Sequence, residues 1–189
     1  MKLTSEICKK RLTLAENMAI RSACRQLKTG CVITDANDER HASAFNRQPE
    51  GKPACNAKNC PPKDQDDYCK FVEHAESIAI DLFKSKHGRT KARFCFTDWF
   101  PCHHCFIQLY RNGVRTFVFL YDHTDCKKEK ADCETTVQLH LFRKRLEYEQ
   151  ELSAIQCLAK EYGDVNLVHF KNEEMIFLME GGKNVRLER

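Results

Sequence analysis

Two short motifs constrain this chain more than any other feature, because their side chains have to meet around one metal ion. His74-Ala75-Glu76 and Pro101-Cys102-His103-His104-Cys105 each stand where the surrounding pattern predicts the start of a helix. Two cysteines separated by two residues at a helix start can bind one zinc ion, and a histidine from a neighbouring helix supplies a third ligand. The fourth position is then left to water, which is typical of a catalytic rather than a structural zinc. We therefore predict a catalytic zinc held by His74, Cys102 and Cys105.

Glu76 stands two residues after the histidine, within reach of the water that such a zinc would hold. Zinc lowers the pKa of its water towards neutrality, and a carboxylate beside it can carry the released proton to a departing amine. The pattern H-x-E followed by P-C-x-x-C is the signature of zinc-dependent nucleobase deaminases. A Cys-x-x-Cys pair alone more often belongs to a structural zinc site or a redox pair, but the two motifs together favour deamination with Glu76 as catalytic acid and base. His103 and His104 exceed the ligand count and are predicted to be exposed helix residues.

The remaining sequence predicts helices and short strands that alternate along the chain. Two strands in succession, then helices between further strands, indicate an α/β fold with three layers, α/β/α, around a central mixed sheet of about five strands. No linker divides the chain, so we predict a single domain over residues 1–189, with a charged helical extension at about 122–150 that is either exposed or an oligomer contact. The predicted helices are 5–27, 74–86, 102–112, 134–162 and one after Asn172, and the predicted strands are 31–34, 40–46, 92–97, 116–121 and 165–170.

Composition narrows the class of protein. Charged residues make up 31% of the chain with a net charge of only +4, which suits a soluble protein with an anionic substrate such as a nucleotide but falls short of the dense basic patch of nucleic-acid binders. No stretch approaches the roughly 20 apolar residues that cross a bilayer, and the first ten residues lack the apolar core of a signal peptide. We therefore expect a cytoplasmic protein with no membrane partner. Twelve cysteines in a reducing compartment point to metal binding.

From about Leu14 to Tyr121 the chain resembles the deoxycytidylate (dCMP) deaminase family of the cytidine deaminase superfamily, and the late-competence-type members most. The resemblance is carried by Arg21-Ser22-Ala23-Cys24, Gly30-Cys31-Val32-Ile33, Phe45-Asn46, Gly51 and His74-Ala75-Glu76-Ser77-Ile78-Ala79-Ile80. It implies a cytidine deaminase-like fold, hydrolysis of dCMP to dUMP and ammonia, and a homo-oligomer, in a family where dCTP often activates and dTTP inhibits. It also implies substrate contacts at Asn46, Ala75 and Tyr121, with Asn46 holding the nucleotide near its sugar and phosphate.

Two departures from the family pattern bear on function. The family has Gly-Tyr-Asn-Gly around its asparagine, a turn tied to effector binding, whereas this chain has Ala44-Phe45-Asn46-Arg47, so the usual dCTP response is not predicted. The segment from Phe96 to Cys102 resembles the Trp-containing segment of polynucleotide cytidine deaminases, which makes deamination of single-stranded DNA or RNA the alternative function. Enzymes that deaminate adenosine in tRNA share both motifs, but that function does not account for the cysteine-rich loop before His74. A further alternative is a binding or assembly protein that uses zinc only to hold its fold, but such a protein would not need Glu76 as an acid and base.

A second group of cysteines could form another metal site. Four thiolates make the closed tetrahedral site expected of structural zinc, and such a site would hold together a loop with little apolar content. The spacing of these cysteines resembles the additional cysteines of the late-competence-type enzymes, and the alternative is that they are ordinary reduced thiols. This predicted structural zinc would be bound by Cys24, Cys55, Cys60 and Cys69. Cys126 and Cys133 fit no known metal spacing, and Cys8, Cys31, Cys95 and Cys157 are predicted to be small buried residues.

Overall fold

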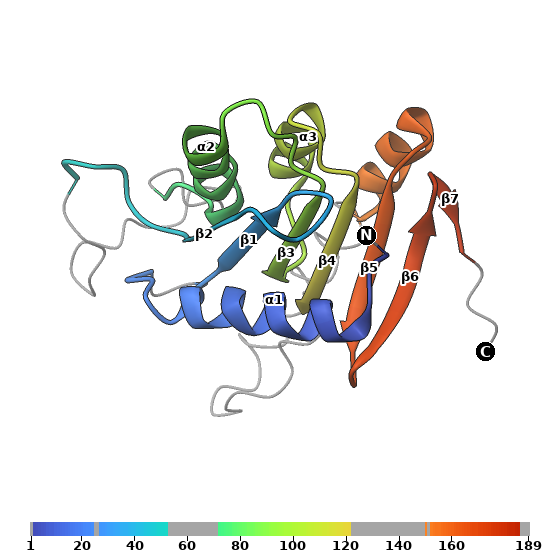
Figure 1. Ribbon diagram of the computed structural model, residues 1–189, viewed down its shortest axis with the longest axis horizontal. Helices are drawn as coiled ribbons and strands as arrows, with labels where there is room; N and C mark the ends of the chain where they lie inside the picture. Colours follow the sequence, from blue (N-terminus) through green and yellow to red (C-terminus); the bar gives the residue numbers. More distant parts are fainter. Residues whose placement is uncertain (1, 25–26, 53–71, 122–149, 151, 186–189) are drawn as a thin grey trace, which may run out of the picture.

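A seven-stranded mixed sheet forms the centre of the protein (Figure 1). The computed structural model describes residues 2–24, 27–52, 72–121, 150 and 152–185. Across the sheet the strand order is β2-β1-β3-β4-β5-β6-β7; β3, β4 and β5 run parallel to one another, and the other neighbouring strands are antiparallel. The strands are β1 (Gly30–Thr34), β2 (His41–Phe45), β3 (Phe94–Trp99), β4 (Thr116–Tyr121), β5 (Asn166–Lys171), β6 (Glu174–Glu180) and β7 (Lys183–Asn184).

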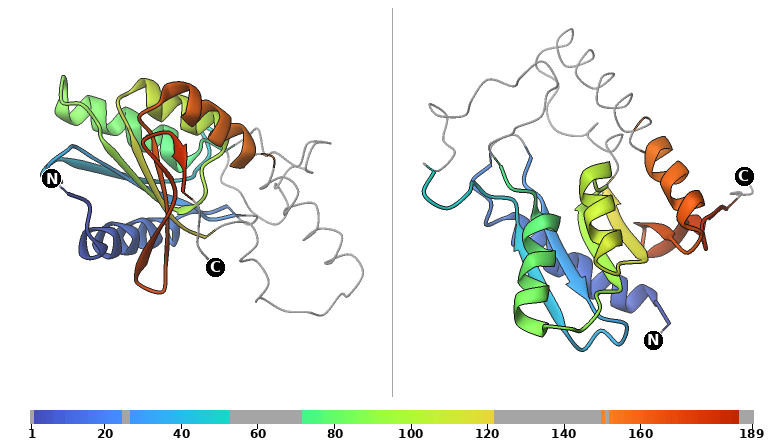
Figure 2. Two further views of the ribbon diagram at one scale, coloured as in Figure 1. Left: turned by 90° about the vertical axis from the view of Figure 1, so that its right-hand side faces the viewer. Right: turned by 90° about the horizontal axis from the view of Figure 1, so that it is seen from above.

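Helices cover both faces of the sheet, as the three-layer prediction required (Figure 2). Helix α1 (Ser5–Ala19) lies on one face, and α2 (Ala75–His87), α3 (His103–Arg111) and a helical stretch at 152–162 lie on the other. Side chains alternate between the faces of a strand, so Phe96 and Val118 pack with α1 while Cys95 and Phe117 pack with α2 and α3. The central strands are apolar on both sides because both faces are covered.

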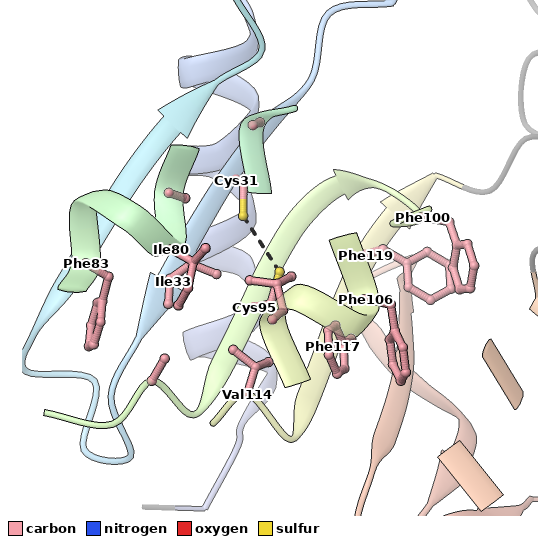
Figure 3. Packing of buried hydrophobic residues seen from close by; sticks show 14 of the residues in the cluster. Cys31, Ile33, Ile80, Phe83, Cys95, Phe100, Phe106, Val114, Phe117 and Phe119 are labelled. Atoms are coloured by element: carbon pink, nitrogen blue, oxygen red, sulfur yellow. Dashed lines mark hydrogen bonds between the residues drawn. The ribbon is translucent and has the colours of Figure 1, made fainter. Parts of the chain in front are cut away.

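The core on the α2–α3 face combines alanine and aliphatic side chains with several phenylalanine rings and two buried thiols (Figure 3). The rings of Phe100 and Phe119 meet edge to face at 4.9 Å, and Phe106 lies 4.5 Å from Phe117. In the same cluster the sulfur atoms of Cys31 and Cys95 are 3.7 Å apart. Cys8, Cys31 and Cys95 are fully buried as predicted, but Cys157 is exposed, because it faces away from the sheet on the helical stretch at 152–162.

The predicted last helix after Asn172 is wrong. Asn172 and Glu173 both have positive φ, at 52° and 65°, so they form a two-residue hairpin turn, and the apolar run that follows them is strand β6 paired with β5. This hairpin and the short β7 raise the strand count from the expected five or so to seven. The first helix also ends earlier than predicted, at Ala19 rather than near residue 27.

Several predictions concern residues outside the described ranges. They include the charged extension at about 122–150, apart from the helical and exposed Gln150, and the cysteines Cys55, Cys60, Cys69, Cys126 and Cys133. The division into one domain likewise stays a prediction. Within the described part of the chain, no helix combines the length and the apolar character that spanning a membrane requires.

Candidate metal centre and active site

The two motifs meet where α2 and α3 begin, beside the carboxyl end of β3. His74 is the N-cap residue of α2 and Cys102 is the N-cap residue of α3, both with extended backbone angles, and Cys105 lies in the first turn of α3. Pro101 directly precedes the N-cap Cys102, and a residue before proline is biased towards extended backbone, which favours a break between β3 and α3. Because α2 and α3 are neighbours on the same face of the sheet, their N-termini present these side chains to one another.

The three predicted ligands form a compact donor set. The Nδ1 atom of His74 lies 3.6 Å from Sγ of Cys102 and 3.4 Å from Sγ of Cys105, and all three donor atoms lie within 4.8 Å of one another. A tetrahedral zinc with Zn–N near 2.0 Å and Zn–S near 2.3 Å separates its nitrogen and sulfur ligands by about 3.5 Å. The donor types and their spacing therefore fit zinc, and among the described residues this is the one such cluster.

Before any metal binds, the protein groups favour the metal-binding form at Cys102 but not at the other two ligands, because the hydrogen bond to Cys102 raises the pKa of His74 to about 9. A hydrogen bond from Cys105, helped by His74, lowers the pKa of the Cys102 thiol to about 4, so this sulfur is a thiolate at neutral pH. The thiol of Cys105, beside that thiolate and buried, has its pKa raised. Zinc binds cysteine as the thiolate. The charge of a bound zinc ion would therefore take the place of the hydrogen bond between Cys105 and Cys102, and the Cys105 thiol would lose its proton.

Glu76 lies in the first turn of α2, next to the ligand His74, with 4% of its surface exposed. Burial raises the pKa of its carboxyl, while the neighbouring His74 opposes that shift. A buried carboxyl with a raised pKa accepts a proton more readily than an exposed one, which suits a group that transfers protons in catalysis. The structure thus brings together the four residues on which the sequence-based hypothesis rests.

Asn46 is buried at the end of β2, where the segment before β1 holds it on several sides. Its Oδ1 accepts the Thr29 N–H at 2.9 Å, its Nδ2 donates to the Leu27 carbonyl at 2.7 Å, and its own carbonyl accepts the Ser22 hydroxyl at 2.7 Å. Ser22 and Thr29 were not among the predicted site residues, although Ser22 lies in a motif that carried the resemblance. The amide of Asn46 therefore has a defined orientation, which depends on contacts far apart in sequence.

The other two predicted substrate contacts lie at different depths. Ala75, the first residue of α2, is fully buried. Tyr121 ends β4 and is 38% exposed; its ring lies 5.5 Å from that of Trp99, and its hydroxyl donates to Glu16 of α1 at 2.9 Å. The half-buried Trp99 and the exposed Tyr121 thus pair at the carboxyl edge of β3 and β4, and Trp99 stands two residues before Pro101.

A cavity of about 270 Å³ opens next to Asn46. Arg21, Arg47 and Lys52 supply positive charge to its wall, with Glu50 as the acidic residue among those that line it. The buried Cys24 also faces this cavity. The backbone joins this cavity wall to the metal cluster. Arg47 of the wall pairs through two backbone hydrogen bonds with Glu73, the residue immediately before His74.

Comparison with known proteins agrees with this site. The sequence model described as "Cytidine and deoxycytidylate deaminase zinc-binding region" matches residues 5–121, which contain the whole cluster. The chain belongs to this family. Its members are hydrolytic deaminases of nucleobases, so the chain is an enzyme of that class with a zinc-binding deaminase domain.

Solved structures support the same fold. The dCMP deaminase of cyanophage S-TIM5 in complex with dCMP and dUMP has a TM-score of 0.51 at 22% identity, over 64% of this chain and 85% of that one. Its apo form has a TM-score of 0.50 at 22% identity, over 65% and 86%. No curated protein sequence matches the chain. The predicted cytidine deaminase-like fold is therefore confirmed.

Proposed function

We propose that this protein deaminates a cytosine nucleotide and that its substrate is dCMP, converted to dUMP and ammonia in cytoplasmic pyrimidine metabolism. The observation that carries the proposal is the cluster of His74, Cys102 and Cys105 beside the buried Glu76, inside the region that matches the family. The cyanophage enzyme of the same fold binds dCMP and dUMP, which supports this choice among the cytosine nucleotides.

Each of the four residues has a role in this proposal. His74, Cys102 and Cys105 would hold a zinc ion, which when bound would supply a water nucleophile at neutral pH. Glu76 accepts the proton of the attacking water and delivers it to the ring nitrogen next to C4. A C4–O bond forms, the C4–N bond breaks, and Glu76 transfers the second proton to the amine, which leaves as ammonia.

The basic cavity beside Asn46 supports a nucleotide, rather than a nucleoside without a phosphate, as the substrate. In this proposal Asn46 orients the sugar, Ala75 lines the base pocket and Tyr121 borders it, and the 5′-phosphate lies in the cavity that Arg21 and Arg47 line. Arginine suits this role because its planar fork matches the geometry of a phosphate. The chain departs from the family turn at Arg47, so this residue could take over part of the binding of the nucleotide.

We also propose a second, structural zinc bound by Cys24, Cys55, Cys60 and Cys69. Support comes from the place of Cys24, which lines the same cavity as Lys52 and Val72. Those two residues flank the segment that carries the other three cysteines. A closed site of four thiolates would hold this segment against the start of β1.

The test is ammonia release from dCMP, CMP, dCTP and deoxycytidine by the purified protein, together with zinc per chain. We expect turnover to be fastest with dCMP and two zinc ions per chain. Cys24→Ser should leave one zinc, and Glu76→Gln should keep both zinc ions but slow ammonia release by about 10²–10⁴-fold. Arg47→Ala should raise KM for dCMP but not for deoxycytidine, with Arg40→Ala, at the far end of β2, as the control. Zinc-loaded protein that deaminates none of the four compounds would refute the proposal.

The Trp99–Tyr121 pair favours one alternative, deamination within single-stranded DNA or RNA. Aromatic rings that reach the surface can stack on bases, and Tyr121 is exposed while Trp99 is half-buried; basic side chains such as Arg21 and Arg47 would follow the phosphate backbone. This function predicts binding to single strands that weakens steeply as salt rises, and deamination of cytosine within them. Absence of both at low salt would exclude it.

A further inference from the structure

Asp98 is a buried acid near the end of β3 that the proposed chemistry does not use. Only 3% of its surface is exposed. Its Oδ1 accepts two backbone hydrogen bonds, from the N–H of Gly30 and from the N–H of Trp99, each at 3.0 Å. One carboxylate oxygen therefore joins the start of β1 to the end of β3.

This contact replaces a step of the β-ladder. The register of β1 and β3 pairs Cys31 with Thr97, so the next pair along would be Gly30 with Asp98. At Gly30, however, side chains make the bonds: the N–H donates to the carboxylate of Asp98, and the carbonyl accepts the Thr97 hydroxyl at 3.2 Å. The side chains of β3 thus hold β1 at the point where the β3 backbone turns away towards Pro101 and Cys102.

The strand held in this way leads to Asn46. Thr29, the residue before Gly30, donates its N–H to Oδ1 of Asn46 at 2.9 Å, and its carbonyl accepts the N–H of Asn46 at 3.0 Å. A continuous path therefore runs from Asp98 through Gly30 and Thr29 to both the side chain and the backbone of Asn46. On its other side Asp98 holds Trp99, three residues before the first cysteine ligand.

We propose that Asp98 is a positioning residue that sets the place of Asn46 relative to the zinc-binding end of β3, and thereby the affinity for the sugar of the nucleotide. The inference rests on the proposed function for its effect on substrate. Burying a carboxyl is unfavourable unless its oxygens are hydrogen-bonded. Here the bonds go to Gly30 of β1, next to the residue that binds Asn46, and to Trp99 at the end of β3 itself.

Two variants separate this role from general stability. Asp98→Ala removes both hydrogen bonds, whereas Asp98→Asn keeps an acceptor oxygen in the same place. Asp35→Ala is a matched control, because Asp35 is also buried and its Oδ1 also accepts two backbone N–H groups, from Glu39 at 3.0 Å and Arg40 at 3.3 Å, but at the opposite end of β1. All three are compared with wild type as zinc-loaded protein.

For Asp98→Ala we expect KM for dCMP to rise about tenfold or more, with a smaller change in kcat and unchanged zinc at the site of His74, Cys102 and Cys105. Asp98→Asn should restore KM to near the wild-type value, and Asp35→Ala should leave it unchanged. The proposal is wrong if Asp98→Ala alters KM no more than Asp35→Ala does, or if Asp98→Asn gives no rescue.

Amide hydrogen exchange tests the same path without substrate. Exchange at Thr29 should speed up in Asp98→Ala and stay slow in Asp98→Asn, because the Thr29 N–H reports on the bond to Asn46. Unchanged exchange at Thr29 in Asp98→Ala overturns the proposal. If the wild-type protein deaminates no nucleotide but Thr29 responds as expected, the proposed substrate fails while the structural link between Asp98 and Asn46 holds.

Discussion

Replacing Gly30 by alanine should push α1 away from the sheet. A Cβ atom at Gly30 would lie 1.9 Å from the carbonyl oxygen of Ala15, 2.8 Å from its carbonyl carbon and 2.9 Å from the nitrogen of Ala19. All three are backbone atoms, so no rotamer change relieves the clash, and α1 has to retreat by about 1 Å or more to reach ordinary contact distance. Helix α1 cannot follow easily, because Leu12 and Ala15 are packed into the core.

The expected loss is at the upper end of the range for overpacked cores, about 3 kcal/mol in the free energy of unfolding. For a chain of this size that corresponds to a fall in Tm of about 6–12 °C. Urea and thermal unfolding of the zinc-loaded protein measure both. Gly163→Ala is the control. No atom lies within 4 Å of its Cβ position, so alanine meets no clash there, and the cost is limited to about 1 kcal/mol of backbone strain at φ +75°. If Gly30→Ala costs no more than Gly163→Ala, the close packing of α1 on β1 is refuted.

Three further predictions follow from buried charges. Glu76→Gln should lower kcat by about 10²–10⁴-fold without loss of zinc, since it removes the proton carrier; an unchanged kcat would assign proton transfer elsewhere. Burial raises the pKa of Asp98 from 3.8 to about 7, so between these values the folded state keeps a proton that the unfolded state releases. Wild-type stability relative to Asp98→Asn should therefore fall by about 1.4 kcal/mol per unit as pH rises from 5 to 7, and parallel urea-unfolding curves would contradict this. Arg11→Met should cost about 3 kcal/mol in the free energy of unfolding, because it leaves the Asp38 carboxylate, bonded to Arg11 Nε at 2.7 Å on a side chain only 10% exposed, without its partner. Arg11→Met combined with Asp38→Asn should cost less than the two single changes added together.

The metal ligands could be predicted from the sequence because their geometry is local. A helix start places residues two and three positions apart in fixed directions, so His74 with Glu76, and Cys102 with Cys105, each define half of a site. Helix and strand types along the first two thirds of the chain follow from the same local periodicity. The three-layer arrangement then follows because strands that are apolar on both faces need helices on both.

The β5–β6 hairpin shows where local reading failed. Asn172 is a common N-cap residue, and Met175, Ile176 and Leu178 fit the spacing of a helix as well as that of a strand. Pairing with β5 decided between the two, since residues 166–171 offered an edge that a helix could not have covered with hydrogen bonds. Such a choice depends on the neighbouring strand, which no short window of sequence contains.

By itself, the sequence determined which side chains can bind zinc and carry a proton, because these depend on residue type and on spacing within a single turn of helix. Only the tertiary structure decided that Nδ1 of His74 lies 3.4–3.6 Å from the two sulfur atoms and that Asp98 reaches Gly30. It likewise decided that Asn46 is held by Leu27 and Thr29. These distances join residues remote along the chain, and they arise from how helices and strands pack together rather than from any preference of the residues themselves.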